Sequence, residues 1–192
     1  MKRIYTLAIA LFVLVGLNLN AQDKKEQEEA AAPTSYTFSF PDYKNQMINI
    51  TASSKGLDFK EQKGKVVLLD FFGKKCPPCL MEIPHLIKIQ EKYKKDFQIV
   101  ALQVQQPMTH EQLVSFIEEK GINYQVADTP KMQDFIGFIM SAAQWRGMIP
   151  FMILLSEDGL VYKMYKGMVS EEVLSKDIEF LIAEKSKNID KK

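Results

Sequence analysis

The hydrophobic pattern of the chain predicts several short strands. The strongest signal is Val66–Phe72, an almost unbroken apolar run after the polar Lys63-Gly64-Lys65, as expected of a strand buried on both faces. Similar runs and turn signals predict further strands at Gln98–Gln105, Phe151–Leu155 and Leu160–Tyr165, and a leading hairpin built from Tyr36–Phe40 and Met47–Thr51. The turn signal Glu157-Asp158-Gly159 predicts that the strands on either side of it pair as a hairpin.

Four other segments have the spacing of helices, with apolar residues three and four positions apart. They are Cys79–Tyr93, Glu111–Lys120, Lys131–Ala143 and Ser170–Glu184. Gly121 stands where a helix C-cap is expected, and Ser170 is a good N-cap ahead of two glutamates. Because strands and helices alternate before a terminal hairpin and helix, the sequence predicts an α/β layer fold.

The length, net charge and cysteine count exclude several classes of protein. A length of 192 residues suits one domain with a full hydrophobic core. The formal net charge of +1 gives no broad field for nucleic acid, so we expect no nucleic-acid partner. Only two cysteines are present, which excludes a disulfide scaffold.

The first 21 residues have the pattern of a secretory signal peptide. A basic Met1-Lys2-Arg3 precedes an apolar run from Ile4 to Leu19, and Ala21 offers a small residue for cleavage. An uncleaved membrane anchor is the alternative, although the run is slightly short for a span. We therefore expect a periplasmic or other extracytoplasmic location.

The mature chain is expected to begin with a tether. Residues 22–34 carry no large apolar side chain and are expected to form a flexible linker, which leaves 35–192 as the folded domain. Ordered structure is expected to end near Glu184, because Lys185–Lys192 is polar.

The conspicuous chemical feature is Cys76-Pro77-Pro78-Cys79, placed where the strand ending at Phe72 turns into a helix. A helix N-terminus stabilises a thiolate, and two intervening residues bring the sulfurs within disulfide reach. Half of a zinc site has the same spacing. Export, the strand-to-helix position and the lack of a second C-x-x-C favour a redox dithiol over metal ligands.

Three short motifs then suggest a family. Phe71–Cys79, Glu82-Ile83-Pro84 and Ile149-Pro150 ahead of a strand resemble the thioredoxin superfamily, in particular its exported TlpA/ResA-type proteins. The resemblance runs from about Ser35 to the final helix. It implies a thioredoxin-like fold, in which helices flank a central mixed β-sheet, with an N-terminal β-hairpin extension and an inserted helix. It also implies a thiol–disulfide oxidoreductase.

The resemblance assigns roles to individual residues. Cys76 matches the exposed attacking cysteine, and Cys79 matches the buried resolving one. Asp70 matches the buried aspartate of thioredoxin, and Glu82 a glutamate lining the active-site cavity, so that either could accept the Cys79 proton. Independently, a carboxylate within a buried strand needs a shifted pKa or a partner. Pro150 matches the cis-proline that faces the dithiol.

The neighbours of these residues depart from the family. Lys75 and Phe72 stand where tryptophans are common, and Gly147-Met148-Ile149 replaces Gly-Val or Gly-Thr before the cis-proline. We expect Lys74 and Lys75 to lower the pKa of the Cys76 thiol, and Ile149 and Met148 to hold a client strand through their backbone. Pro84 matches a kinking proline, and Trp145 is expected to serve packing.

We expect no cofactor beyond a redox-active Cys76–Cys79 disulfide and no metal site. The chain has no flavin or nicotinamide motif, so its electrons must come from or go to another protein, a membrane donor or acceptor. The expected clients are thiols and disulfides of exported proteins, with apocytochrome c and a reductant's role in cytochrome c biogenesis implied by the resemblance.

Other functions stay open on the sequence alone. A disulfide-forming oxidant would use the same residues in the opposite direction. A copper-binding metallochaperone could hold Cu(I) with the two cysteines and Met81, Met148 or His85, since thiolates and thioethers suit that ion. A redox-inert interaction module is disfavoured by the intact C-x-x-C. His85 and His110 are more typical of surface or packing residues than of ligands.

Overall fold

The computed structural model describes residues 35–189. The predicted signal peptide (1–21) and linker (22–34) lie outside the described residues and stay predictions. Within the described range, no helix combines the length and hydrophobicity needed to cross a membrane.

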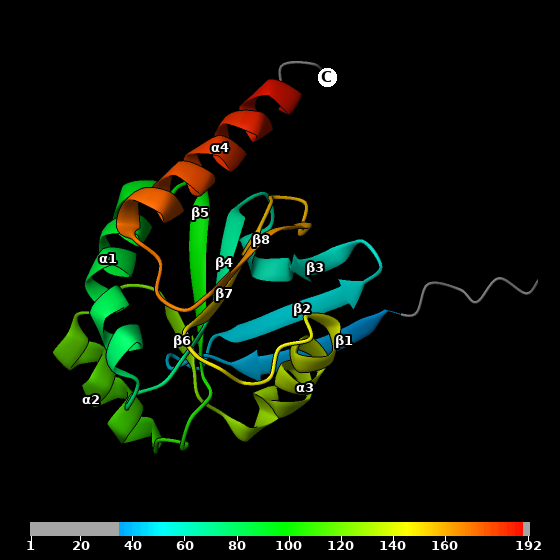
Figure 1. Ribbon diagram of the computed structural model, residues 1–192. Coiled ribbons are helices and arrows are strands. Elements are labelled where there is room, and N and C mark those ends of the chain that lie inside the picture. The colour runs from blue at the N-terminus through cyan, green and yellow to red at the C-terminus, as the bar shows by residue number, and fades with distance from the viewer. Residues whose placement is uncertain (1–34, 190–192) are drawn as a thin grey trace, which may run out of the picture. The chain divides into compact units, whose positions relative to one another are not determined.

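A five-stranded mixed sheet forms the centre of the domain (Figure 1). Its strands are β4 (Val66–Phe72), β5 (Phe97–Gln103), β6 (Gln125–Ala127), β7 (Phe151–Leu155) and β8 (Val161–Lys166), in the order β6-β5-β4-β7-β8. β4, β5 and β6 are parallel, whereas β7 is antiparallel to β4 and β8. Every residue of β4 is buried, as its unbroken apolar run predicted. β6 was not predicted, because a strand of three residues has no readable periodicity.

A smaller antiparallel sheet precedes the central one. It consists of β1 (Tyr36–Pro41), β2 (Met47–Ser53) and β3 (Gly56–Phe59) in that order. The predicted hairpin is therefore present but has a third strand that the sequence analysis did not identify. Gly56, with φ of +131°, makes the turn into β3, and Leu57 N–H donates to the carbonyl of Gly159 in the β7–β8 turn (2.9 Å). This bond ties the small sheet to one end of the central sheet.

Four α-helices pack on the central sheet, and two single turns of 3-10 helix join the strands and helices. The α-helices are α1 (Pro77–Tyr93), α2 (His110–Lys120), α3 (Gln133–Ala142) and α4 (Glu171–Ile189). The 3-10 turns are η1 (Lys60–Gln62) and η2 (Pro130–Met132). Gly121 caps α2 in the left-handed conformation (φ 66°), and Ser170 Oγ accepts from Val173 N–H at the start of α4 (3.3 Å). Both caps follow the sequence prediction. The single helix predicted over 131–143 is divided into η2 and α3.

The two faces of the sheet carry separate hydrophobic cores. Alternate residues of β4 point to opposite sides, so Leu68 packs with α1, α2 and α4, while Leu69 packs with α3 and the small sheet. Figure 1 shows α3 beside β1 and β2, and α1 and α2 on the other side of β5. Asp70 points to the same side as Leu68, because the two are two positions apart. That side also holds both cysteines.

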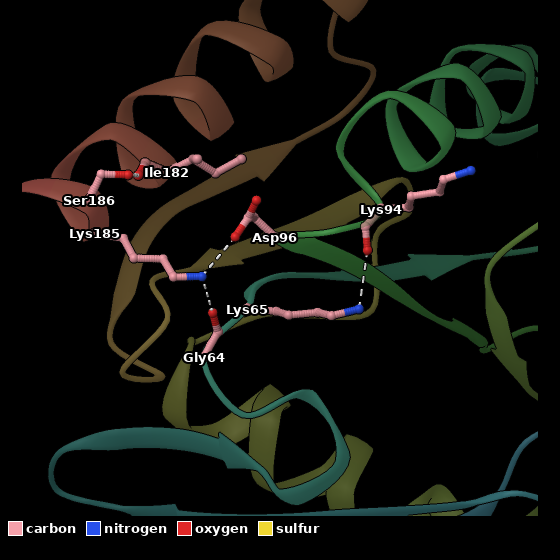
Figure 2. A network of polar contacts seen from close by, with 7 residues as sticks. All are labelled: Gly64, Lys65, Lys94, Asp96, Ile182, Lys185 and Ser186. Atoms are coloured by element: carbon pink, nitrogen blue, oxygen red, sulfur yellow. Dashed lines mark hydrogen bonds and ion pairs between the residues drawn. The ribbon is translucent and has the colours of Figure 1, made fainter. Parts of the chain in front are cut away.

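The last helix runs farther than its composition suggested. α4 continues to Ile189, whereas Glu184 was the expected end of ordered structure. Lys185 Nζ donates to the carbonyl of Gly64 (2.7 Å) and pairs with Asp96 Oδ1 (2.8 Å), as Figure 2 shows. These contacts fix the helix beside the residues that lead into β4 and β5. A polar lysine thus extends the helix through partners that are distant in sequence.

Candidate active site

Cys76 is the N-cap residue of α1, one loop beyond the end of β4. Its Sγ accepts a hydrogen bond from Cys79 N–H (3.3 Å), and its carbonyl accepts from Leu80 N–H (3.0 Å). Pro77 and Pro78 occupy the first helical positions, where a missing N–H costs nothing. The local sequence therefore starts the helix at the first cysteine and directs the Cys79 N–H at its sulfur.

The two cysteines form a disulfide across the first turn of α1. Their Cα atoms are 5.2 Å apart. Both residues are buried, with 6% of Cys76 and 3% of Cys79 exposed, so the expectation that Cys76 is exposed is wrong for this disulfide-bonded form. The predicted pairing is thus present, and the sulfur that accepts from Cys79 N–H here is the atom that would carry the thiolate charge after reduction.

Two buried carboxyls lie on the inner side of this turn. Asp70, in the middle of β4, and Glu82, on α1, are 4% and 3% exposed. Burial, reinforced by the charge of Glu82, raises the pKa of Asp70 to about 8. Burial also raises the pKa of Glu82 to about 7, against the opposing effect of a hydrogen bond from Val169 N–H (2.6 Å). Strand and helix thus bring both predicted bases together, with pKa values close to neutral pH.

Tyr124 completes this inner group, and no sequence motif pointed to it. It is buried just before β6, on the sheet face that carries the cysteines. Burial, and then the charges of Asp70 and Glu82, raise its pKa well above the ordinary value. A neutral phenol therefore lies close enough to the two carboxyls to sense their charge.

The loop before β7 forms a second wall. The Ile149–Pro150 peptide bond is cis, in line with the prediction, and Ile149 packs against the core that contains both cysteines. Trp145 Nε1–H donates to the carbonyl of Met148 (2.7 Å), and its ring stacks on Phe151 at 5.0 Å. The expected packing role of Trp145 is confirmed, and it also fixes the loop. The side chain of Met148 is 76% exposed beside this wall.

The predicted lysines lie on the opposite flank, in the loop between β4 and α1. Lys74 is half-buried and Lys75 is exposed. Lys75 N–H donates to Gln105 Oε1 (2.9 Å), and Lys75 Nζ lies 3.5 Å from Gln106 Oε1. Both glutamines follow β5, and the sequence analysis did not identify either of them.

The structure also places the groups considered for copper. Met81 on α1 is largely exposed, and His85 Nδ1 is buried without a hydrogen-bond partner among the described residues. Across residues 35–189, no cluster of three or more histidine, cysteine, aspartate or glutamate side chains has a metal-binding arrangement.

Comparison with known proteins identifies the family. A family model described as AhpC/TSA family matches residues 37–190, which is most of the chain. The chain belongs to the AhpC/TSA family. This confirms the predicted thioredoxin-like resemblance, and the mixed sheet with its leading antiparallel strands confirms the predicted fold class.

Curated relatives of this AhpC/TSA protein carry a functional name. The "Thiol-disulfide oxidoreductase ResA" of Halalkalibacterium halodurans is 27% identical over 128 residues, which cover 66% of this chain and 68% of that protein. The ResA of Bacillus thuringiensis (strain Al Hakam) is 32% identical over 121 residues, covering 62% and 65%. The chain therefore spans about two thirds of the length of these relatives.

A solved structure agrees with the fold. The thiol:disulfide interchange protein of Chlorobium tepidum TLS, described as a thioredoxin family protein, has a TM-score of 0.56 to this chain at 23% identity. The match covers 79% of this chain and 97% of that one. Family and relatives together confirm the predicted enzyme class, a thiol–disulfide oxidoreductase.

Proposed function

We propose that this protein is an extracytoplasmic, ResA-type reductant that transfers electrons from its Cys76–Cys79 dithiol to disulfides of exported proteins, apocytochromes c among them. One observation carries the proposal: the disulfide spans the first turn of α1, where the helix N-terminus faces the sulfur of Cys76. Such a position stabilises a thiolate at Cys76. Glu82 and the cis Ile149–Pro150 bond agree with the ResA-type assignment.

The reaction is a two-step exchange. The Cys76 thiolate attacks one sulfur of a client disulfide, forms a mixed disulfide and releases the first client thiolate. The Cys79 thiolate then attacks Cys76 Sγ, forms the Cys76–Cys79 disulfide and releases the second client thiolate. Two electrons pass to the client, and the dithiol of a membrane donor protein restores them by the same exchange.

The inner carboxyls supply the proton acceptor for the second step. Cys79 is buried and must lose its proton before it attacks. Asp70 and Glu82 have pKa values raised to about 8 and about 7, close to that of a thiol and to neutral pH. Proton transfer is most efficient between groups matched in this way.

The wall before β7 holds the client in this proposal. The Met148 carbonyl is engaged by Trp145 Nε1–H, which fixes the loop, so the proposal assigns the client contact to the rest of the Met148 and Ile149 backbone beside the buried Pro150. An extended client segment lying along this backbone would bring its disulfide to Cys76, as in strand addition to a sheet edge.

The direction of transfer follows from the balance of charges. A stabilised Cys76 thiolate favours the reduced form and hence an oxidant, as do the nearby lysines. Two buried carboxyls have the opposite effect, because ionising Cys79 beside them is costly. We assign the greater weight to the carboxyls, since the low-dielectric interior strengthens their effect whereas solvent screens the lysines.

Trapping the client tests both the reaction and its direction. The full chain with Cys79→Ser, expressed with its own leader in the native host, should accumulate mixed disulfides on Cys76. Mass spectrometry that finds apocytochromes with C-x-x-C-H segments supports the proposal. A broad set of secreted multi-cysteine proteins, together with a strongly oxidising potential, would overturn the reductant's role. The Cys76→Ser, Cys79→Ser double variant is the control.

A further inference from the structure

A surface pocket lies on the flank of Cys76 that faces away from the Pro150 wall. It has a volume of about 350 Å³ and is lined by Lys74, Lys75, Gln105 and Gln106. β5 and β7 pair with opposite edges of β4, so the loop after β5 and the loop before β7 flank the residues that follow β4. A client segment held at Pro150 would therefore cross Cys76 and continue toward this pocket.

Hydrogen bonds from a buried glutamine hold the pocket in shape. Gln103, at the end of β5, is 1% exposed. Its Oε1 accepts from Gln105 N–H (2.6 Å), and its Nε2 donates to the carbonyl of Gln106 (2.8 Å). Gln105 in turn accepts from Lys75 N–H. The two loops are thereby joined, so their polar side chains are organised before any ligand arrives.

The charge of the pocket is uncompensated. Neither Lys74 nor Lys75 belongs to any of the ion pairs formed within residues 35–189. The acid adjoining this network is Asp128, whose Oδ2 accepts from Gln103 Nε2 (3.1 Å) and Met108 N–H (2.7 Å). It does not line the pocket. Two lysines and two glutamines thus line a pocket next to the residue that precedes Cys76.

We propose that this pocket binds the carboxylate of an aspartate or glutamate that flanks the reactive cysteine of a client. The inference rests on the proposed function and names a class of client for it, disulfides with acidic neighbours. Lysine and amide N–H groups are suitable hydrogen-bond donors to a carboxylate. Opposite charges beside the reacting sulfurs increase the rate at which client and protein associate in the reactive orientation.

Matched peptides test the inference. Three synthetic peptides share one intramolecular disulfide and differ only in the two residues beside it: Glu-Glu, Gln-Gln or Lys-Lys. Each oxidises the reduced protein, and acid-quenched samples give the rate constant. We expect the Glu peptide to react about fivefold faster than the Gln peptide in low salt, the Lys peptide more slowly, and the differences to shrink at high salt.

Variants assign the preference to the pocket. In the Lys74→Gln, Lys75→Gln variant, the rate constant for the Glu peptide divided by that for the Gln peptide should fall to about one. This ratio does not depend on the fraction of Cys76 that is ionised, because both peptides react with the same thiol. Lys55→Gln is the matched control. Lys55 lies in the β2–β3 turn, next to the β7–β8 turn and thus at the opposite end of β7 from Pro150. A ratio that is unchanged in the pocket variant overturns the inference.

A second measurement separates this inference from the proposed function. A cysteine-free acidic peptide with a fluorescent label should bind the oxidised protein, and the Lys74→Gln, Lys75→Gln variant should bind it more weakly. If no peptide oxidises the reduced protein, the proposed function fails while this binding result still decides on the pocket. Equal binding by the variant and the unaltered protein would rule the pocket out.

Discussion

The two ends of the Cys76–Cys79 disulfide lie in opposite electrostatic surroundings. On the inner side, Cys79 is next to a dry interior that holds Asp70 and Glu82, whose burial raises both pKa values. On the outer side, Cys76 adjoins a loop with two lysines that form no ion pair within the described residues. One covalent bond thus joins a cysteine beside buried carboxyls to a cysteine beside two lysines.

This difference separates the roles of the two thiols. In the proposed mechanism the thiolate forms first at Cys76, because a helix N-terminus and nearby positive charge both favour a thiolate. In the same proposal Cys79 passes its proton to one of the buried carboxylates, since a second buried anion beside them would be costly. The arrangement lets the first cysteine attack at once and delays the second until a base is in place.

The largest expected effect comes from removing the inner charge. Asp70→Asn should stabilise the fold at high pH by up to about 6 kcal/mol. The pKa of Asp70 is about 8 in the folded protein against an ordinary 3.8, so only the unfolded chain ionises between these values and stability falls as pH rises. The gain of the variant should therefore be absent below pH 4, grow through neutral pH and level off above pH 8.

Urea unfolding at pH 4, 6 and 9 measures this gain. Asp58→Asn is the matched control, because it removes an exposed carboxyl from β3. A gain for Asp70→Asn of the same size at pH 4 and pH 9 would show that the variant acts through packing rather than through the buried charge.

The second prediction concerns the rate at which Cys79 resolves the mixed disulfide. Asp70→Asn and Glu82→Gln should each form this intermediate normally but release the client about ten- to a hundredfold more slowly, because the proton acceptor is lost. Stopped-flow measurement of client release after rapid mixing gives the rate. Release kinetics that are unchanged in both variants would remove Asp70 and Glu82 from the mechanism.

Glu82 has a structural contact that can be separated from its charge. Its Oε1 accepts a hydrogen bond from Val169 N–H in the β8–α4 loop. In the same loop, Gly167 N–H donates to the carbonyl of Pro150 (2.9 Å). Glu82→Gln keeps an acceptor oxygen, whereas Glu82→Leu leaves the N–H unpaired. Hydrogen exchange at Val169 should be about fivefold faster in the leucine variant than in the glutamine variant. Equal exchange rates would mean that the contact does not hold the loop.

Local signals identified the outer half of this site. The apolar run of β4, the prolines after Cys76 and the capping residues each act over a few neighbouring positions, and the structure follows them closely. Cys76 and Cys79 could be paired because only two residues separate them. These features can be predicted without knowing which distant parts of the chain are in contact.

The inner half depends on contacts that a single sequence does not reveal. Glu82 meets Val169 across 87 residues, and Tyr124 comes close to the carboxyls from a position just before the short strand β6, which carries no pattern of its own. The glutamines after β5 were missed for a related reason, since amides in a loop have no distinctive spacing. Asp70 could be singled out from its place in an apolar strand, but its position near Glu82 could not be predicted from that strand alone.

The smallest expected effect concerns the surroundings of Cys76. In the reduced protein, Lys75→Met should raise the pKa of the Cys76 thiol, because it removes a positive charge that stabilises the thiolate. Lys75 is exposed, so solvent screens that charge and the change should be modest. We expect Cys76 alkylation near pH 6 to slow by about two- to threefold, and the difference to vanish above the thiol pKa.

Alkylation measured from pH 4 to 9 in the Cys79→Ser background, with Lys55→Met as the control, gives the full titration. If Lys75→Met leaves that curve in place, Lys75 is a solvated surface charge, and the helix N-terminus alone accounts for the favourable surroundings of Cys76.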